Sequence, residues 1–489
     1  MVKNGLQGNK VAPPDYAKAT TGRRLRSGLQ GKQTAVIGLG REGMELVRFL
    51  IRQGANVTVL DGANRQALGA RYLEAKKLGA DFRLGGDYLQ NLTDFQIVFR
   101  SPGISLQQKE FKKATRTGVE ISSTTRLFFE LCPAKIVGVT GTKGKSTTTS
   151  LIYHLLKGSS SASSGTHNKA RIYLAGNIGH SPIPLLAKLK KIDVVVLELS
   201  SFQLEDLNRS PQIAVLLNVV PEHLDRHKTM GKYLAAKQNI YKYQKKSDIL
   251  VASKDFGPTR IALQQTKGKI CPVSTKQILR HGVYLTDDEI IYRDIKTGRR
   301  QVVAPVSAIK LRGEHNIQNV LPAIAAAIVA GAPIKRIEQR LKAFKPLHHR
   351  LEIVRTIGKT VFINDSLGTT PEAAAAAVLA FADMPKALIV GGVYKGGDIK
   401  QLAKIVAKSD VKFVALIGQS AKKFKAVFKK HTPFTPVKIV AKFDEAVKVA
   451  YAKVKNGGAV ILSPACASFD MFKDAYDRGE QFKRIVDNL

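Results

Sequence analysis

Val139-Thr-Gly-Thr-Lys-Gly-Lys-Ser-Thr147 is the stretch that decides the fold, because it joins a predicted strand at 135–140 to a predicted helix. Glycines at 141 and 144 let backbone N–H groups curl around phosphate oxygens. The following lysine can reach the β- and γ-phosphates, the serine hydroxyl can bind Mg²⁺, and the helix N-terminus adds positive potential. The predicted phosphate-binding residues are Thr140, Gly141, Thr142, Lys143, Gly144, Lys145, Ser146 and Thr147.

The spacing of this loop departs from the usual Gly-x-x-x-x-Gly-Lys-Ser/Thr, because Val139 occupies the first glycine position. A glycine-rich turn that happens to contain lysine is the alternative interpretation. The preceding strand and the following helix favour a phosphate loop.

Two further strands are predicted downstream of the loop, at 193–198 and 213–218. Their near-continuous apolar runs are typical of parallel strands buried on both faces. Glu198 ends the first, at the sheet edge where such folds bind ligands, and could hold Mg²⁺. His223 follows the second and could bind a metal or a phosphate. A solvated strand end and a structural histidine are the alternatives.

Upstream, Gly38-Leu-Gly-Arg-Glu-Gly43 lies between a predicted strand at 34–38 and a predicted helix at 42–54. Taken alone, this pattern suggests NAD or FAD, with Asp61 at the end of the next strand available for a ribose hydroxyl. Alternating strands and helices continue to about residue 125, which predicts a mostly parallel sheet.

Downstream, residues 250–310 predict short antiparallel strands, and 316–330 an alanine-rich helix. A last block has predicted strands at 360–364, 387–390, 413–417 and 459–462, with helices between them. The predicted fold class is α/β with three consecutive domains: a Rossmann-like N-terminal domain, a central P-loop ATPase domain with a parallel sheet, and a Rossmann-like C-terminal domain. The predicted boundaries are a disordered basic tail at 1–31 and domains at 32–126, 127–345 and 346–489.

Composition narrows the class of protein further. The three cysteines form no CxxC pair, so the sequence indicates neither a zinc site nor a disulfide framework, and free thiols fit a reducing cytosol. No run of about 18 apolar residues is present. The formal net charge of +40 suggests a nucleic-acid binder as one alternative. Lysines at helix-face spacing favour a solvated surface, and part of the charge could attract anionic substrates.

A series of motifs resembles the Mur ligases of bacterial cell-wall synthesis, and the glutamate-adding members most. The similar segments reach from the first predicted domain to the last: Ser101-Pro-Gly103, TGTKGKST at 140–147, AGNIG at 175–179, LELSSFQLE at 197–205, NVVPEHLDRH at 218–227, AAKQNIY at 235–241, GEHNIQN at 313–319, HHRLE at 348–352, NDS at 364–366 and LSPACASFDMFKDAYDRGEQF at 462–482.

The resemblance implies roles for residues at these positions. Lys145 and Ser146 would hold ATP phosphate and Mg²⁺, and two Mg²⁺ ions would be bound by Glu198, His223 and a carbamylated Lys237, which alone reads as a surface lysine. Asn177 would contact substrate near the reacting carboxyl group. The remaining ATP contacts implied are Asn316, Asn319, Arg350 and Asp365. The implied substrate contacts are Gly40, Arg41, Asp61, Ser101, Ser200, Gln203 and Ser468, with the first glycine-rich loop receiving a UDP diphosphate.

The implied activity is ATP-dependent addition of glutamate, D-glutamate favoured, to UDP-N-acetylmuramoyl-L-alanine through an acyl phosphate. The implied setting is peptidoglycan precursor synthesis by a cytoplasmic monomer, with no nucleic-acid or membrane partner. An L-glutamate-adding ligase and a folylpolyglutamate synthetase are the alternative enzymes, and an inactive scaffold is a third possibility. The glycine-rich first domain argues against the folate enzyme, which would have no use for a UDP site.

The sequence departs from the family pattern in the expected amino-acid pocket. Leu367 stands where glutamate-adding members commonly have a lysine that binds the amino-acid carboxylate, and a neutral side chain cannot make that pair. Ala475, followed by Tyr476, stands where an aromatic residue is usual. Both departures leave the chirality of the added amino acid open.

Overall fold

The computed structural model describes residues 27–157 and 170–489 of the chain. The described residues fall into two compact units. The first holds residues 27–145, 170–252 and 256–270, and the second holds 146–157, 253–255 and 271–489. Most of the predicted basic tail, residues 1–26, lies outside the described part. Ser27–Leu29 form a short 3-10 helix, η2, and Leu29 is fully buried, so ordered structure begins before residue 32.

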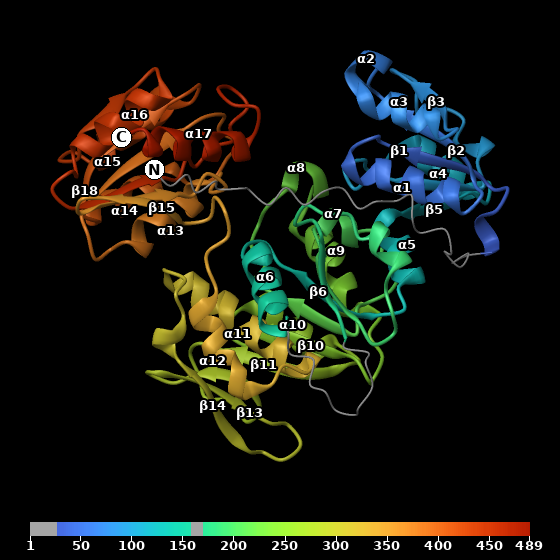
Figure 1. Cartoon of the computed structure of the whole chain (residues 1–489), viewed down its shortest axis with the longest axis horizontal. Coiled ribbons are helices and arrows are strands. Elements are labelled where there is room, and N and C mark those ends of the chain that lie inside the picture. Colours follow the sequence, from blue (N-terminus) through green and yellow to red (C-terminus); the bar gives the residue numbers. More distant parts are fainter. Residues whose placement is uncertain (1–26, 158–169) are drawn as a thin grey trace, which may run out of the picture. The chain divides into compact units, whose positions relative to one another are not determined.

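The first sheet of the first unit is fully parallel, with strand order β3-β2-β1-β4-β5 (Figure 1). Its helices cover both faces: α4 packs on one, and α1, α3 and α5 on the other. The elements are β1 (Gln33–Ile37), α1 (Arg41–Arg52), β2 (Asn56–Asp61), α2 (Arg65–Leu68), α3 (Ala70–Lys77), β3 (Asp81–Leu84), η3 (Leu92–Asp94), β4 (Ile97–Arg100), α4 (Lys109–Arg116), β5 (Glu120–Ser123) and α5 (Thr124–Leu131). The strand order reverses direction at β1, where such sheets bind ligands.

The second sheet contributes to the first unit the parallel run β10-β9-β6-β8-β7. The central position of β6 places the phosphate loop between two neighbouring strands, β8 and β9. The elements along this part of the chain are β6 (Lys135–Thr140), α6 (Lys145–Leu156), β7 (Ile172–Gly176), η4 (Ile183–Ala187), β8 (Val194–Glu198), α7 (Ser201–Leu204), β9 (Ile213–Leu216), α8 (Leu224–His227), α9 (Met230–Lys242), β10 (Ile249–Ser253) and α10 (Gly257–Gln265). From its second residue on, α6 belongs to the second unit.

The second unit carries the run β14-β13-β12-β11. The prediction of antiparallel strands across 250–310 is correct for β12, β13 and β14 but wrong for β10 and β11, which pair in parallel. Four of the five residues of β10 are buried, as a parallel strand covered on both faces requires. The elements are β11 (Lys269–Ser274), β12 (Gly282–Leu285), β13 (Glu289–Arg293), β14 (Arg300–Pro305), η5 (Val306–Ala308), α11 (Glu314–Ala330), η6 (Ile334–Arg336) and α12 (Ile337–Ala343).

The third sheet has the order β15-β16-β20-β17-β18-β19, and only its edge strand β15 is antiparallel to its neighbour. Helices α13, α14 and α15 pack on one face, and α16 and α17 on the other. The elements are β15 (Glu352–Ile357), β16 (Thr360–Asn364), α13 (Pro371–Ala380), β17 (Lys386–Gly391), α14 (Ile399–Lys408), β18 (Val411–Ile417), α15 (Ala421–His431), β19 (Val437–Ile439), α16 (Phe443–Ala452), β20 (Gly458–Leu462) and α17 (Ala475–Asp487).

Three α/β sheets in succession confirm the predicted fold class. In residues 27–157 and 170–489, no helix combines the length and the apolar character needed to cross a bilayer.

Candidate active site

The phosphate loop leaves β6 at Thr140 and enters α6 at Lys145. The Lys145 Nζ donates to the carbonyl oxygens of Thr142, at 2.8 Å, and Gly141, at 3.2 Å, so its amino group folds back over the loop. A side chain at Gly141 would lie 2.5 Å from the Cβ of Leu217, and Gly144 has φ +81. The glycines therefore give the loop its close packing and its turn, and phosphate binding by the loop stays a prediction.

Glu198, the last residue of β8, lies at the end of the strand that pairs beside β6. Its side chain is buried, and its Oε1 accepts from the Asn177 Nδ2 at 2.6 Å. Its Oε2 has no hydrogen-bond partner in the described part of the chain. A buried carboxylate oxygen of this kind needs compensation, and hard cations such as Mg²⁺ take carboxylate oxygens as ligands. The burial of Glu198 thus argues against the alternative interpretation, in which it is a solvated residue at the end of a strand.

Lys237 is buried in α9, at 2% exposed, although its sequence context is that of a surface lysine. Its Nζ donates to the Gly141 carbonyl at 2.8 Å and lies 3.3 Å from the Thr140 Oγ1. Burial, and then the positive charge of Lys145, lower the pKa of Lys237 well below its usual range. Two lysine amino groups thus share one acceptor, the carbonyl of Gly141.

His223 follows β9 and has a left-handed backbone, φ 55, which histidine adopts more readily than most residues. Its ring lies 5.1 Å from that of Phe202. Burial lowers the pKa of His223, Glu222 opposes that shift, and Lys145 and Lys237 add to it. The imidazole therefore favours its neutral form, which can bind a metal.

His227 is a neighbouring residue that our sequence analysis did not single out. Its ring stacks on Phe202 with 5° between the planes, and its Nε2 lies 3.0 Å from the Ser201 Oγ. Only its position within the 218–227 motif could have signalled a role.

Three predicted substrate contacts already have local partners. Ser200 and Gln203 form a capping box at the start of α7, with each side chain bonded to the backbone of the other. The Asp61 carboxylate accepts from the amides of Leu39, at 2.7 Å, and Ala63, at 2.9 Å, so it holds the glycine-rich loop. Their substrate roles stay predictions, but these bonds give each residue a structural task as well.

The first glycine-rich loop is held to neighbouring motifs of the same unit. Arg41 donates from its Nη1 to the carbonyl of Gly179 at 2.6 Å, which joins this loop to the segment that carries Asn177. A side chain at Gly38 would lie 3.3 Å from the Cβ of Ser101. Gly40 has open space around its Cα, with no atom within 4 Å of a built Cβ.

The second unit contains the other predicted contacts: Ser146, Thr147, Asn316, Asn319, Arg350, Asp365 and Ser468. Asn316 donates from its Nδ2 to the Arg312 carbonyl at 2.7 Å, and its Oδ1 accepts from the Asn319 Nδ2 at 3.2 Å. Asp365 is buried and accepts from the Ser463 Oγ at 2.7 Å. Burial raises the pKa of Asp365 to about 7, although this hydrogen bond and Arg350 oppose the shift.

The first unit thus brings Lys145, Lys237 and His223 into mutual electrostatic contact, next to the strand that ends in Glu198. Within the described residues, no group of three or more His, Cys, Asp or Glu side chains forms a ready metal cage. A metal here would need ligands beyond the side chains present, such as phosphate oxygens.

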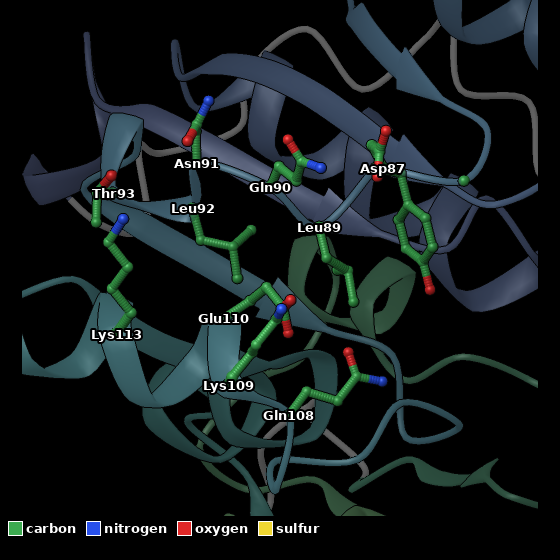
Figure 2. Close-up of a pocket in the computed structure, with 12 residues that line it drawn as sticks. Asp87, Leu89, Gln90, Asn91, Leu92, Thr93, Gln108, Lys109, Glu110 and Lys113 are labelled. Atoms are coloured by element: carbon green, nitrogen blue, oxygen red, sulfur yellow. The ribbon is translucent and has the colours of Figure 1, made fainter.

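A pocket of about 720 Å³ lies elsewhere, in the first domain (Figure 2). It lies between the segment at 86–93 and the start of α4, at residues 108–110 with Lys113. None of the predicted site residues lines it. The pocket is therefore separate from the phosphate loop.

Comparison with known proteins matches three family descriptions along the chain. They are the Mur ligase MurD-like N-terminal domain at residues 32–123, the Mur ligase middle domain at 139–327 and the Mur ligase glutamate ligase domain at 349–466. The UDP-N-acetylmuramoylalanine–D-glutamate ligase of Acetivibrio thermocellus is 40% identical over 472 residues, which cover 94% of this chain and 97% of that protein. The protein of the same name from Clostridium tetani is 37% identical, over 94% and 98%.

Solved structures support the fold at lower identity. The UDP-N-acetylmuramate-alanine ligase of Thermotoga maritima is 18% identical, with a TM-score of 0.57 over 94% of this chain and 99% of that one. MurF ligase from the same organism, solved in complex with ADP, is 17% identical, with a TM-score of 0.55 over 95% and 97%. Full-length identity to curated relatives, a family match in each domain and a shared fold lead to one conclusion: the chain belongs to the Mur ligase family.

Proposed function

We propose that the chain is an ATP-dependent ligase that joins D-glutamate to UDP-N-acetylmuramoyl-L-alanine in peptidoglycan precursor synthesis. The observation that carries the proposal is the near full-length match to relatives named for this activity, at 40% and 37% identity. The group of Lys145, Lys237, His223 and Glu198 at the ends of β6, β8 and β9 supports it: Lys237 and Glu198 are buried, and Lys145 and Lys237 place positive charge next to the phosphate loop.

ATP answers a chemical difficulty, since a carboxylate does not react with an amine at neutral pH. Transfer of the γ-phosphoryl group to the substrate carboxylate gives an acyl phosphate, and the amine of glutamate then displaces phosphate. Lys145 and the loop amides would neutralise the transferring group, and Asn177 would orient the carboxylate. No protein nucleophile is required, so positioning and charge compensation are the chain's contribution.

One observation indicates that the residues present could bind Mg²⁺. The buried Oε2 of Glu198 has no hydrogen-bond partner in the described residues. Glu198, His223, Ser146 and a carbamylated Lys237 would hold the two ions proposed. Bound Mg²⁺ would offset negative charge on the phosphates. Carbamylation would turn the buried Lys237 from an amine into an anionic oxygen ligand, which is consistent with its lowered pKa and its lack of exposure.

The remaining predicted contacts to ATP and the amino acid are part of the same proposal. Asn316 and Asn319 are proposed for the adenine, Arg350 and Asp365 for phosphate and ribose, and Ser468 for glutamate. Thr369 and Thr370, which are close to Leu367 in sequence, are proposed as hydrogen-bond donors to the amino-acid carboxylate in place of the usual lysine. The names of the relatives support the D-isomer over the L-isomer.

The deciding experiment supplies UDP-N-acetylmuramoyl-L-alanine, Mg²⁺ and ATP with either D- or L-glutamate, and follows ADP and the coupled product by mass spectrometry. We expect product with D-glutamate and little with L-glutamate. If product forms only with L-glutamate, the added amino acid is L-glutamate and the proposed D-isomer is wrong. No product with either isomer would contradict the proposed function.

A further inference from the structure

Two arginines hold the backbone of the Ser101-Pro-Gly-Ile104 loop, which is here called the 101–104 loop. Arg100 donates from its Nη1 to the carbonyl of Ile104 at 2.9 Å and lies 3.4 Å from that of Pro102. Arg226 donates to the carbonyls of Gly103 and, at 3.3 Å, Pro102. Each of three successive carbonyls therefore faces a guanidinium group.

The two arginines differ in their surroundings. Arg100 is fully buried, lies 3.2 Å from Asp206 and 3.6 Å from Glu205, and also donates to the Phe202 carbonyl at 3.1 Å. Its removal would leave buried carboxylates without compensation, so it is part of the fold. Arg226 is only half-buried, and its guanidinium lies 5.3 Å from the centre of the Phe202 ring.

Arg226 connects two segments that lie far apart in sequence. It belongs to α8, whose first turn is closed by a hydrogen bond of 3.1 Å from its amide to the carbonyl of His223. Its side chain reaches the 101–104 loop, more than 120 residues upstream. The helix that begins after His223 is therefore bonded directly to a loop of the first sheet.

The 101–104 loop borders the first glycine-rich loop, since a side chain at Gly38 would meet Ser101 at 3.3 Å. This glycine-rich loop is the proposed receiver of the UDP diphosphate. A loop that must become ordered on binding costs affinity, and a loop held beforehand does not. We infer that Arg226 is a positioning residue for the UDP-bearing substrate: it fixes the 101–104 loop at the proposed diphosphate site and ties it to the segment that carries His223. The inference rests on the proposed function.

The test compares Arg226→Gln and Arg226→Lys with wild-type protein, using UDP-N-acetylmuramoyl-L-alanine as the probe in calorimetry. Arg226→Gln is expected to weaken binding by roughly 10-fold or more and to raise the KM of this substrate equally. The KM values for ATP and glutamate should stay within about twofold, because those sites do not involve the loop. Arg226→Lys should restore part of the affinity, since lysine keeps the positive charge and a donor but lacks the planar fork of guanidinium nitrogens.

Two readouts separate positioning from a general loss of structure. Amide hydrogen exchange at Gly103 and Ile104 should speed up in Arg226→Gln, with the melting temperature and the exchange of β6 unchanged. Arg209→Gln, at an exposed arginine of the same unit, is the matched control and should behave as wild type.

The outcomes are distinct. Wild-type affinity and exchange in Arg226→Gln overturn the inference and leave the proposed function intact. Equal losses for all three substrates, or a general fall in melting temperature, also overturn it. If wild-type protein does not bind UDP-N-acetylmuramoyl-L-alanine at all, the proposed function fails and the inference fails with it.

Discussion

At the scale of single residues, Lys145 offers the most direct test of the phosphate loop. Its amino group lies over two loop carbonyls and raises the local positive potential felt by His223 and Lys237. We expect Lys145→Met to lower kcat by roughly 100-fold or more, because charge on the transferring phosphoryl group would go uncompensated. ADP release under saturating substrates measures this. Lys191→Met, at an exposed lysine, is the control, and a kcat within twofold of wild type in Lys145→Met would contradict the prediction.

Asp365 gives a pH dependence of stability. Burial raises its pKa in the folded protein to about 7, from 3.8 for the free side chain. Between these values, unfolding releases a proton, so a rise in pH favours the unfolded state. This group's stabilising contribution is fully present below about pH 4, falls by about 1.4 kcal/mol per pH unit through that window and levels off above pH 7.

Asp365→Asn removes the titrating group and keeps the shape. We compare the urea concentration at the midpoint of unfolding for wild type and Asp365→Asn. As the pH is raised from 5 to 7, we expect the wild-type midpoint to decrease relative to that of the variant. A constant difference between the two proteins across this range would show that the carboxyl group does not titrate there.

The placement of the candidate site residues in the fold could be predicted from the sequence only in part. The phosphate loop and the strand-end Glu198 follow from local pattern, because glycine spacing and strand polarity are local. The burial of Lys237 does not, since it arises from tertiary packing: α9 packs against β6, β9 and neighbouring helices, and the lysine amino group meets the Gly141 carbonyl. The capping role of Ser200 and Gln203 could have been predicted, because a Ser-x-x-Gln pair before an apolar residue is a helix-start signal.

At the scale of elements, the first glycine-rich turn depends on the absence of one methyl group. A side chain at Gly43 would lie 1.9 Å from the carbonyl oxygen of Gly38, whereas one at Gly40 would meet nothing within 4 Å. We expect Gly43→Ala to displace the start of α1 and lower the melting temperature by several degrees, in line with about 1–3 kcal/mol of strain. Gly40→Ala, whose φ of −72 suits alanine, should melt as wild type does. Equal melting of both variants would contradict the steric argument.

Most elements agree with the predicted ones to within one or two residues. The strand predicted at 135–140 has the bounds of β6, because an unbroken apolar run before a glycine-rich loop fixes both ends. The prediction for 250–310 failed at β10 and β11. The partner of β10 is β9, more than 30 residues upstream, and a short apolar run such as β11 does not reveal whether its neighbour runs parallel or antiparallel. Gly54, with φ +80, ends α1 as a glycine after a helix should.

At the scale of the whole molecule, the net charge of +40 is the feature that the proposed function explains least. Lysines on α15 are exposed on one side of the helix, while Phe424 and Phe428 are buried on the other, which is the pattern of a solvated face. We expect any binding to DNA to be independent of sequence and to weaken steeply with salt. Fluorescence anisotropy with two unrelated duplexes, at low and physiological salt, measures this. Saturable, sequence-dependent binding at physiological salt would instead support the nucleic-acid alternative.

The buried Oε2 of Glu198 also bears on the stability of the folded protein, in addition to its proposed part in catalysis. Among residues 27–157 and 170–489 this Oε2 has no hydrogen-bond partner, and a buried carboxylate oxygen left so weakens the folded state. A cation that binds the carboxylate in the folded chain alone therefore shifts the unfolding equilibrium towards the folded state. Adding Mg²⁺ together with ADP should therefore raise the melting temperature of wild type, and much less that of Glu198→Gln, with ADP and a chelator as the reference. The supply of magnesium and nucleotide would then govern the resistance of this protein to heat and proteolysis.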